Sequence, residues 1–326
     1  MKHYYPAYYQ SFCCIAADCP DSCCQGWDVV IDSDTERFYY TVKGEFGEKL
    51  RSTIYTDNDG DRVFHLAKEK KCPFWGEDRL CDIYRELGEE NLCATCRQFP
   101  RLSMEYADFT EHSLALACPE AARLILLTDN AYSSFTQETS EGCEDYDAQE
   151  IEMLLQARRK CAEILTSPKP LSERLRECLA YGKKFQTRLH PYEEPNQPFD
   201  SSALSALFGE LEYIDERNRD RFQQACAHAA DLSGQETELT RLALYYLYRY
   251  TLNAVGSLDV LAPMKHMAVS VVVISNLSRD LDLSLTDAAQ LYSKETEQSY
   301  ENMERLYDAF GYDPAFSTEN IINLIS

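Results

Sequence analysis

The sequence predicts a mainly α protein in which an irregular, cysteine-rich N-terminal region with a few short strands precedes an all-α helical bundle. Ten of the 14 cysteines lie within the first 118 of the 326 residues, and the later chain carries apolar residues at helical spacing. Hydrophobic residues make up 44% of the chain, which is enough for a sizeable core without disulfides. A polar stretch from Ser133 to Asp147 marks the boundary between these two regions. We therefore predict a cysteine-rich head at 1–130, a linker at 131–147 and a helical domain at 148–326.

The head is expected to hold short elements separated by turns. Aspartate caps a helix by accepting hydrogen bonds from its first free amides, proline favours the first helical position, and glycine favours the left-handed backbone that ends a helix. From these signals we expect, in order, a strand at 28–32, a helix capped by Asp34 that runs to Tyr40, a turn at 58–60, a strand at 62–66, a helix at 78–87 closed by Gly88, and a helix from Pro119 to Leu127.

Amphipathic helices are expected throughout the C-terminal region. Ile151, Leu154 and Leu165 recur on one helical face, and Leu204 and Leu207 recur on another. The tyrosines within 245–250 fit either the lining of a pocket or ordinary packing between helices, and we favour packing. Further helices are predicted at 239–254, 260–277, 285–291 and 298–310, with a short one after Ser317.

The charge of the chain excludes some partners. It holds 55 acidic and 32 basic residues, for a formal net charge of −23. Residues 1–120 alone hold 13 Lys and Arg against 22 Asp and Glu, so neither part offers the basic face that binds a phosphate backbone. We expect no nucleic-acid partner. An acidic surface attracts lysine-bearing protein segments, and it also maintains solubility.

The sequence gives no sign of secretion or membrane insertion. The first residues lack an apolar signal segment, and the longest apolar stretch, 260–277, is interrupted by Lys265 and His266. We therefore expect a cytoplasmic protein without a membrane partner. In a reducing compartment, cysteines serve as metal ligands or reactive thiols more often than as disulfides.

The cysteines of the head are spaced as metal ligands. Separations of two to four residues let neighbouring thiolates converge on one centre, while distant segments supply the remaining ligands. Only Cys93 and Cys96 have the spacing of a zinc knuckle, so the irregular remainder fits an iron–sulfur cluster better than a zinc ribbon. The number of thiols exceeds one four-ligand site, which leaves either two metal centres or some structural thiols. Four scattered cysteines are expected to be small buried hydrophobes, namely Cys143, Cys161, Cys178 and Cys226.

Cys118 has a separate argument for ligation or reactivity. If Pro119 begins a helix, the thiol lies at a helix N-terminus, where the dipole and free amides stabilise a thiolate.

Common nucleotide motifs are absent from the sequence. No two of the 12 glycines are two residues apart, which excludes a Gly-x-Gly-x-x-Gly turn, and there is no Gly-Lys-Ser/Thr loop. A standard Rossmann or P-loop enzyme is therefore not expected.

Four stretches of the head carry a combined pattern. They are Tyr8-x3-Phe12-x-Cys14-Ile-x3-Cys19-x3-Cys23-Cys24-x-Gly26-Trp27-x4-Asp32, then Cys72-Pro-Phe74-x6-Cys81 with Gly88-Glu89, then Cys96-x2-Phe99-Pro100-Arg101, then Leu116-x-Cys118-Pro119-Glu120. Together they cover about the first 125 residues, and the combination resembles the flagellin lysine-N-methylase family. The middle stretches also resemble a broader class of domains that chelate zinc or iron.

The resemblance implies S-adenosylmethionine-dependent transfer of a methyl group to lysine ε-amines of flagellin, with a [4Fe-4S] cluster held by the head. Zinc is the alternative metal. Gly26 stands where the Cys-x3-Cys-x2-Cys motif of radical S-adenosylmethionine enzymes places its third cysteine, so standard radical chemistry is not expected. Cys13 and Cys93 lie beside the motif positions and are treated as extras. The implied metal ligands are Cys14, Cys19, Cys23, Cys24, Cys72, Cys81, Cys96 and Cys118.

No catalytic base or cofactor-binding residue can be selected from the sequence. A lysine ammonium has no lone pair, so the site must remove its proton or disfavour its charge. Tyrosine and carboxylate side chains suit this task, but the chain has 22 Tyr and 55 acidic residues. The main hypothesis is a protein-lysine N-methyltransferase acting on flagellin or another lysine-bearing protein. The alternative is a non-enzymatic zinc- or iron-binding module whose helical region binds a protein.

Overall fold

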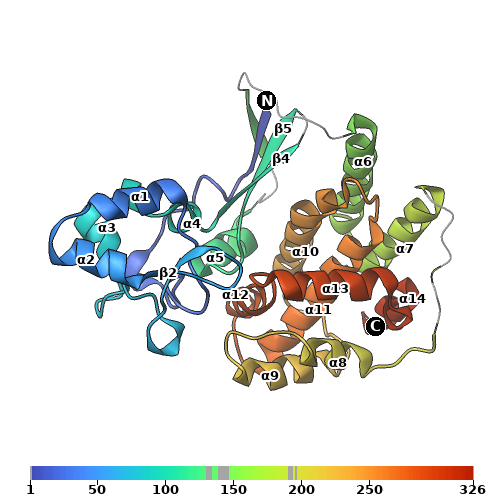
Figure 1. Ribbon diagram of the computed structural model, residues 1–326. Helices are drawn as coiled ribbons and strands as arrows, with labels where there is room; N and C mark the ends of the chain where they lie inside the picture. Colours follow the sequence, from blue (N-terminus) through green and yellow to red (C-terminus); the bar gives the residue numbers. More distant parts are fainter. Residues whose placement is uncertain are drawn as a thin grey trace. The chain divides into compact units, whose positions relative to one another are not determined.

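The computed structural model describes residues 2–106, 108–129, 134–138, 147–189, 194 and 197–325, the side chains of 134–138 excepted. The chain forms two compact units. Unit 1 comprises Met1–Phe12, Ser103–Ala117 and Ala121–Ser326, and unit 2 comprises Cys13–Leu102 and Cys118–Glu120. The predicted class is confirmed, because helices predominate and the cysteine-rich N-terminal part holds short, irregular elements (Figure 1).

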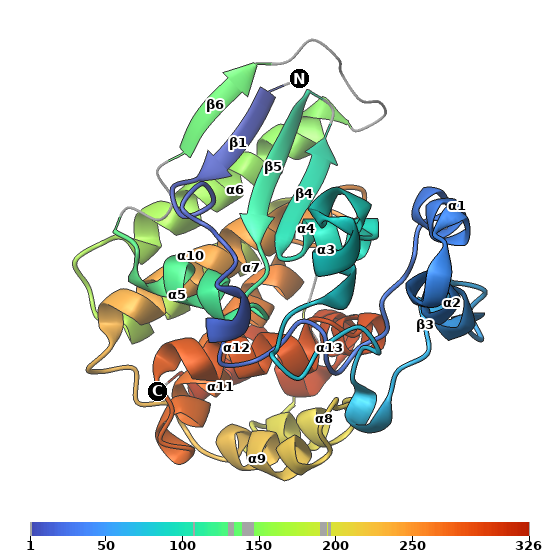
Figure 2. The ribbon, with the colours of Figure 1, turned by 90° about the vertical axis from the view of Figure 1, so that its left-hand side faces the viewer.

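A four-stranded sheet in unit 1 was not predicted. Its strands are β1 (Lys2–Pro6), β4 (Arg101–Tyr106), β5 (Phe109–Leu114) and β6 (Ser134–Glu138). They lie in the order β4-β5-β1-β6, with β1 parallel to β5 and antiparallel to β6 (Figure 2). Strand β6 falls within the expected linker at 131–147, most of which lies outside the described residues. Each partner of β1 is more than 100 residues away in the sequence, so a local pattern carries no signal for this pairing.

The rest of unit 1 is a bundle of helices, as predicted. A partly buried ion pair links it to the sheet, since Arg158 of α6 donates to Glu111 of β5 at 2.8 Å. The helices are α6 (Ala148–Leu165), α7 (Leu171–Leu189), α8 (Ala203–Gly209), α9 (Arg217–Cys226), α10 (Glu236–Tyr250), α11 (Leu261–Asp280), α12 (Leu285–Thr296), α13 (Tyr300–Tyr312) and α14 (Thr318–Leu324).

Polar side chains fix where several of these helices begin. Asp147 caps α6, and Ser284, Ser299 and Ser317 cap α12, α13 and α14 by accepting backbone N–H bonds of the first turn. The starts of these helices were therefore readable from the sequence to within a few residues.

Helix α11 forms the core of the bundle. It packs against α7, α9, α10, α12, α13 and α14, and 17 of its 20 residues are buried. By length and composition it could cross a membrane, but 94% of its most apolar stretch is buried inside the protein. Its all-round apolar surface is therefore explained by packing against other helices.

Unit 2 is built from short elements. They are α1 (Ser33–Thr41), α2 (Gly44–Thr53), β2 (Ile54–Thr56), β3 (Arg62–Phe64), α3 (Asp82–Leu87), α4 (Ala94–Gln98) and the start of α5 (Pro119–Leu127). Strands β2 and β3 form an antiparallel pair. The elements surround a hydrophobic core that includes Tyr39, Leu50, Phe64 and Phe74.

Two local predictions in unit 2 were wrong and others were confirmed, while the helix predicted at 78–87 begins only at Asp82. No strand forms at 28–32, where Val30 makes only an isolated bridge to Val63. Asp32, and not Asp34, caps α1, because its carboxylate accepts the Thr35 N–H at 2.9 Å. Helix α3 does end at Gly88, whose φ of 91° is readily adopted by glycine, and α5 does begin at Pro119.

Candidate functional site

All ten cysteines of the N-terminal part belong to unit 2. The chain leaves this unit after Leu102 and returns to it for only three residues, Cys118–Glu120. Cys118 directly precedes α5, which is the helix N-terminal position expected for it. None of the thirteen cysteines that the structure describes is in a disulfide, and Cys143 lies outside the described residues. Unit 2 therefore collects its thiols from distant parts of the chain.

Five of these cysteines lie in or against the core of unit 2. Cys72 is 8% exposed and Cys93 is 1% exposed, and both are members of the core cluster itself. The partly buried cysteines packed against the same cluster are Cys24, Cys81 and Cys96. These thiols are held among apolar side chains and are not spread over the surface.

Backbone contacts position the five thiols. The Cys72 N–H donates to the Cys24 carbonyl at 2.8 Å, so two loops more than 40 residues apart are joined at their cysteines. Cys81 is the N-cap residue of α3, and Cys93 is the N-cap residue of α4. Cys96 lies within α4, three residues after Cys93. Two short helices therefore present cysteines at their N-termini, where free amides favour negative charge.

Backbone amides donate to three of the sulfurs. The amides of Phe74 and Tyr84 act to lower the pKa of Cys72 and Cys81, but burial outweighs them; at Cys93 the thiol and the backbone amide of Cys96 lower the pKa. Such bonds favour the thiolate, which is the form that binds a metal.

Burial acts in the opposite direction on most of the thiols. It raises the pKa of Cys72 to about 12 and also raises the pKa of Cys81. The pKa of Cys96 is raised by its hydrogen bond to Cys93 and by burial, and the same bond lowers the pKa of Cys93. Several thiolates crowded into an apolar site repel one another, so a bound cation would stabilise them together.

Six cysteines are neighbours in this network, because each interacts electrostatically with others of the set: Cys23, Cys24, Cys72, Cys81, Cys93 and Cys96. Five of them were among the eight implied ligands. Cys14 and Cys19 continue the network, since Cys19 interacts with both Cys14 and Cys23. Cys93 was not among the implied metal ligands. Its Cys-x2-Cys spacing with Cys96 is the signal in the sequence that points to it.

The described residues hold no preformed chelate. No three His, Cys, Asp or Glu side chains among them are arranged to hold a metal ion in this conformation. The structure does bring the thiols together in one unit, and thiolates are suitable ligands for a soft metal or an iron–sulfur cluster.

Gly26 explains why the third position of the radical-enzyme motif is not cysteine. Its φ is 112°, and its N–H donates to the Lys70 carbonyl at 3.0 Å. A side chain at this φ strains the backbone, so glycine is favoured where the first cysteine loop turns towards the loop before Cys72.

Cys161, Cys178 and Cys226 are buried in unit 1, as predicted. Within the bundle the Cys178 thiol donates a hydrogen bond to the Cys161 carbonyl oxygen at 3.5 Å. Tyr245, Tyr246 and Tyr250 are also buried, so packing between helices accounts for them.

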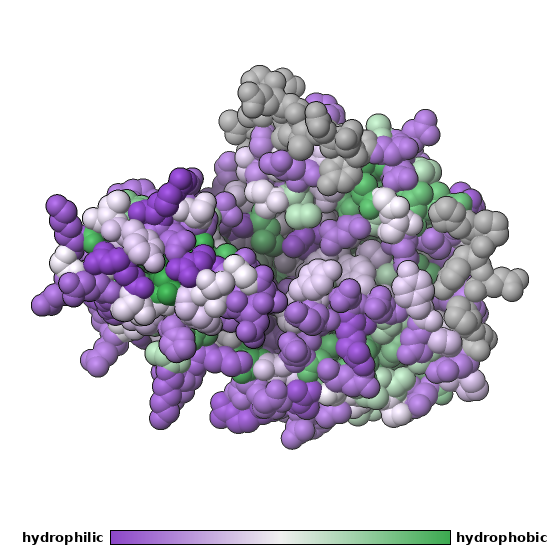
Figure 3. All heavy atoms as spheres, viewed as in Figure 1, coloured by the Kyte–Doolittle hydropathy of each residue, from purple (hydrophilic) through white to green (hydrophobic). Residues whose placement is uncertain are grey.

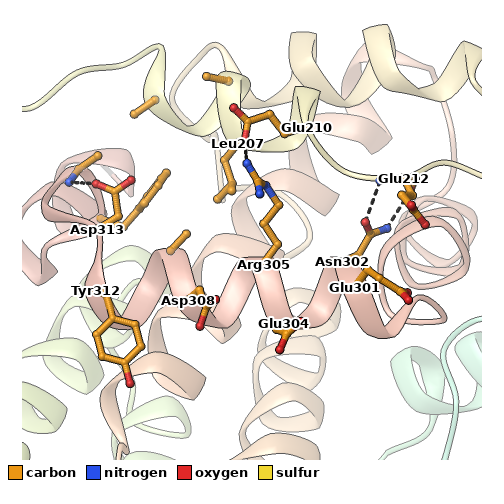
Figure 4. A pocket seen from close by; sticks show the side chains of 15 residues that line it. Leu207, Glu210, Glu212, Glu301, Asn302, Glu304, Arg305, Asp308, Tyr312 and Asp313 are labelled. Carbon is orange, nitrogen blue, oxygen red and sulfur yellow. Dashed lines mark hydrogen bonds and ion pairs between the residues drawn. The ribbon is translucent and has the colours of Figure 1, made fainter.

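A groove with acidic walls lies between α8 and α13 in unit 1 (Figure 4). Its volume is about 810 Å³. Arg305 pairs with Glu210 across it, and Asn302 donates to the Glu212 carbonyl at 2.7 Å. The groove is lined by one guanidinium and six carboxylates, those of Glu210, Glu212, Glu301, Glu304, Asp308 and Asp313. Hydrophilic side chains cover much of this face of the molecule (Figure 3).

The protein is therefore of mainly α class, with one unit rich in thiols and another built largely of helices. Comparison with curated proteins then places it more narrowly. Over 134 residues it is 34% identical to flagellar biosynthetic protein FliU of Salmonella muenchen, a match that covers 37% of this chain and 75% of FliU. The chain therefore belongs to the family of FliU and the lysine-N-methylases.

Two lysine-N-methylases match over a smaller share of their length. The enzyme of Salmonella typhimurium strain LT2 is 34% identical and that of Salmonella choleraesuis strain SC-B67 is 32% identical, each over 134 residues. The match spans 31% of each of these two proteins. No family model matches the chain, and no solved structure matches it.

Proposed function

We propose that this chain is an S-adenosylmethionine-dependent protein-lysine N-methyltransferase of the cytoplasm, acting on flagellin or another lysine-bearing protein. The observation that carries the proposal is the gathering of six thiols in one unit of a chain from the lysine-N-methylase family. Membership of the family supports the reaction, and the thiols support a metal centre.

The metal centre is proposed to be a cysteine-ligated [4Fe-4S] cluster, with zinc as the alternative. The network of Cys23, Cys24, Cys72, Cys81, Cys93 and Cys96 offers more than four soft ligands, and Cys14, Cys19 and Cys118 lie in the same unit. When bound, the metal would supply the positive charge that buried thiolates require and would join loops that have little regular structure.

The reaction places two demands on the chain. The target ammonium must lose its proton, because nitrogen needs a lone pair to attack the methyl carbon. As the new N–C bond forms, the S–C bond of S-adenosylmethionine breaks and S-adenosylhomocysteine leaves. Nitrogen, carbon and sulfur must therefore be held nearly in line by the protein.

The surface charge supports a lysine-bearing substrate. The chain has a formal net charge of −23, and the groove between α8 and α13 has six carboxylates against one guanidinium. Acidic surfaces raise the local concentration of cationic segments and speed encounter, and salt weakens this effect.

The proposal is tested by methyl transfer from labelled S-adenosylmethionine. Protein purified and reconstituted without oxygen is incubated with the labelled compound and flagellin from the same source, and the label on lysine is located by mass spectrometry. The proposal predicts labelled lysine with the unaltered protein and with Cys226→Ala, and a loss of labelling with Cys96→Ala. Bound metal without any labelling would instead favour the non-enzymatic zinc- or iron-binding module.

A further inference from the structure

The groove between α8 and α13 separates two helices of unit 1 that pack mainly against other helices (Figure 4). Helix α8 packs against α9, and α13 packs against α11. The space left between α8 and α13 has a volume of about 810 Å³. This volume lies within the range of pockets that bind ligands, so the groove can receive side chains of another molecule.

The floor of the groove is apolar. Leu207 of α8 and Phe316, which follows α13, line it and are 8% and 3% exposed. The other apolar lining residues are small, namely Ala203, Ala206, Ala309 and Ala315. Their size leaves room for a partner, and covering this apolar surface would favour binding.

The walls of the groove are acidic. Glu301, Glu304 and Asp308 lie on one face of α13, because residues three or four positions apart share a helix face. Glu210 and Glu212 lie on the opposite wall, at the end of α8 and just after it. All five residues are exposed. The groove thus presents an apolar floor between two rows of carboxylates.

Most of this negative charge has no cation beside it. Of the carboxylates that line the groove, only that of Glu210 pairs with a cation among the described residues. That cation is Arg305, and the side chains of the pair are 51% and 55% exposed. Because exposed ion pairs contribute little free energy, an incoming cation can replace Arg305 at Glu210.

One end of the groove is held in place by a buried side chain. Asn302 of α13 is 2% exposed and donates to the Glu212 carbonyl oxygen at 2.7 Å. It also accepts the Glu212 N–H at 2.8 Å. These two bonds join α13 to the segment after α8. The groove is therefore preformed, which lowers the free-energy cost of binding a partner.

The lining defines the chemistry of the partner. The two rows of carboxylates favour Lys and Arg side chains, and the apolar floor favours Leu and Ala side chains. A segment that carries the two kinds on separate faces is a cationic amphipathic helix, and such helices bind in hydrophobic grooves. A second copy of this chain is disfavoured, because its formal net charge is −23.

We propose that the groove between α8 and α13 is a docking surface for a cationic amphipathic helix of a partner protein. The apolar face of that helix packs on the floor. Its cations pair with Glu304, Asp308 and Glu210, where one of them displaces Arg305. Carboxylates hold an ammonium in its charged form, whereas methyl transfer needs the neutral amine, so the groove is not the place of the reaction. The inference applies to a methyltransferase and to a non-enzymatic module alike.

Fluorescence anisotropy of the full chain with a labelled synthetic peptide tests the groove. The peptide consists of Lys, Leu and Ala and forms a helix with its Leu side chains on one face. Glu304→Gln with Asp308→Asn should weaken binding about 3- to 10-fold, because two exposed ion pairs are lost. Asp220→Asn with Asp282→Asn is the matched control, since it removes the same charge from exposed positions outside the groove.

Two further variants separate charge from shape. Arg305→Ala removes a competing cation and should bind the peptide several-fold more tightly. Ala206→Trp fills the groove from an exposed position of α8 and should abolish binding. Far-ultraviolet circular dichroism should show that each variant keeps its helices.

A peptide of the same composition, with its Leu side chains scattered around the helix, should bind much more weakly. Equal binding of the two peptides, equal affinity of the groove and control variants, or no binding at all would overturn the assignment. Self-association that Ala206→Trp abolishes would overturn it in favour of a second copy, and equally tight binding of spermidine would overturn it in favour of a small oligoamine. The assay needs neither metal nor S-adenosylmethionine, so its result is independent of the methyl-transfer test.

Discussion

The carboxylate of Asp32 accepts a hydrogen bond from the backbone N–H of Ala94 at 2.8 Å. The same carboxylate caps α1 by accepting from the Thr35 N–H at 2.9 Å and the Thr35 hydroxyl at 2.8 Å. Ala94 is the first residue of α4, directly after Cys93. One side chain therefore satisfies amides at the starts of two helices and fixes the helix that carries Cys93 and Cys96.

Replacing Asp32 should destabilise unit 2. In Asp32→Ala, α1 loses its cap and the Ala94 amide loses its acceptor, which together cost about 2–3 kcal/mol of unfolding free energy. The measurement is urea unfolding of protein purified without oxygen, compared at equal metal content. Asp34→Ala is the control, because Asp34 is exposed and pairs with Arg37 on the surface, so it should change stability little. Equal losses in the two variants would mean that Asp34 shares the capping role.

The contribution of Asp32 should also depend on pH. Hydrogen bonds from Ala94 and Thr35 outweigh burial and lower the pKa of Asp32 to about 2, against about 3.9 in an unfolded chain. Since the folded-state pKa is depressed, the stabilisation is complete above about pH 4 and is lost as the pH falls towards 2. The stability difference between the unaltered protein and Asp32→Ala should therefore shrink over this interval. A difference that stays constant from pH 5 to pH 2.5 would contradict the account.

Lys265 should be essential to the core of the bundle. Its ammonium lies 2.6 Å from Glu194 and 2.8 Å from the Phe310 carbonyl oxygen, and it is 2% exposed. Burial lowers the pKa of Lys265, whereas Glu194 favours its charged form. Lys265→Met leaves the Glu194 carboxylate buried without its closest cation and should cost about 3–5 kcal/mol.

The control for this prediction is Lys183→Met. Lys183 lies 3.4 Å from the same carboxylate, but its side chain is 40% exposed, so its loss should matter far less. The double variant Lys265→Met with Glu194→Met should recover part of the lost stability, because no unpaired charge remains. Thermal unfolding of the three variants measures these differences. A smaller loss for Lys265→Met than for Lys183→Met would refute the role assigned to Lys265.

Cysteine substitutions should divide into two groups. Cys72→Ala, Cys93→Ala, Cys96→Ala and Cys118→Ala should lose bound metal and the fold of unit 2 that the metal supports. Cys161→Ala and Cys226→Ala should keep the metal and lose only the packing of a small buried side chain. Metal content and near-ultraviolet circular dichroism distinguish these outcomes. Equal metal loss in both groups would show that the gathered thiols are not the ligands.

The sequence was most informative where local signals decide the structure. Pro119 marks the start of α5, Gly88 marks the end of α3, and the apolar period of the later chain predicts the bundle. The four-stranded sheet was missed because β1 pairs with strands more than 100 residues away. The cap at Asp32 was missed because Asp34 offers the same local signal, and the contact with Ala94 that favours Asp32 is 62 residues distant.

As with the fold, only part of the candidate site could be predicted from the sequence. The family resemblance named five of the six gathered thiols and left out Cys93, although the Cys-x2-Cys spacing of Cys93 and Cys96 pointed to it; in the structure Cys93 precedes α4 and lies in the core. The tyrosines of 245–250 were predicted to pack between helices, and Tyr245, Tyr246 and Tyr250 are buried there.

The most direct test of the central claim is the measurement of iron, acid-labile sulfide and zinc bound per chain after purification without oxygen. The claim is that the gathered thiols of unit 2 form a metal centre, with Cys93 among them. It predicts about four iron and four sulfide per chain in the unaltered protein, or stoichiometric zinc if zinc is the native metal. The content should be retained in Cys226→Ala and lost in Cys93→Ala with Cys96→Ala. Protein that binds neither iron–sulfur nor zinc, or a double variant with full metal content, would contradict the claim.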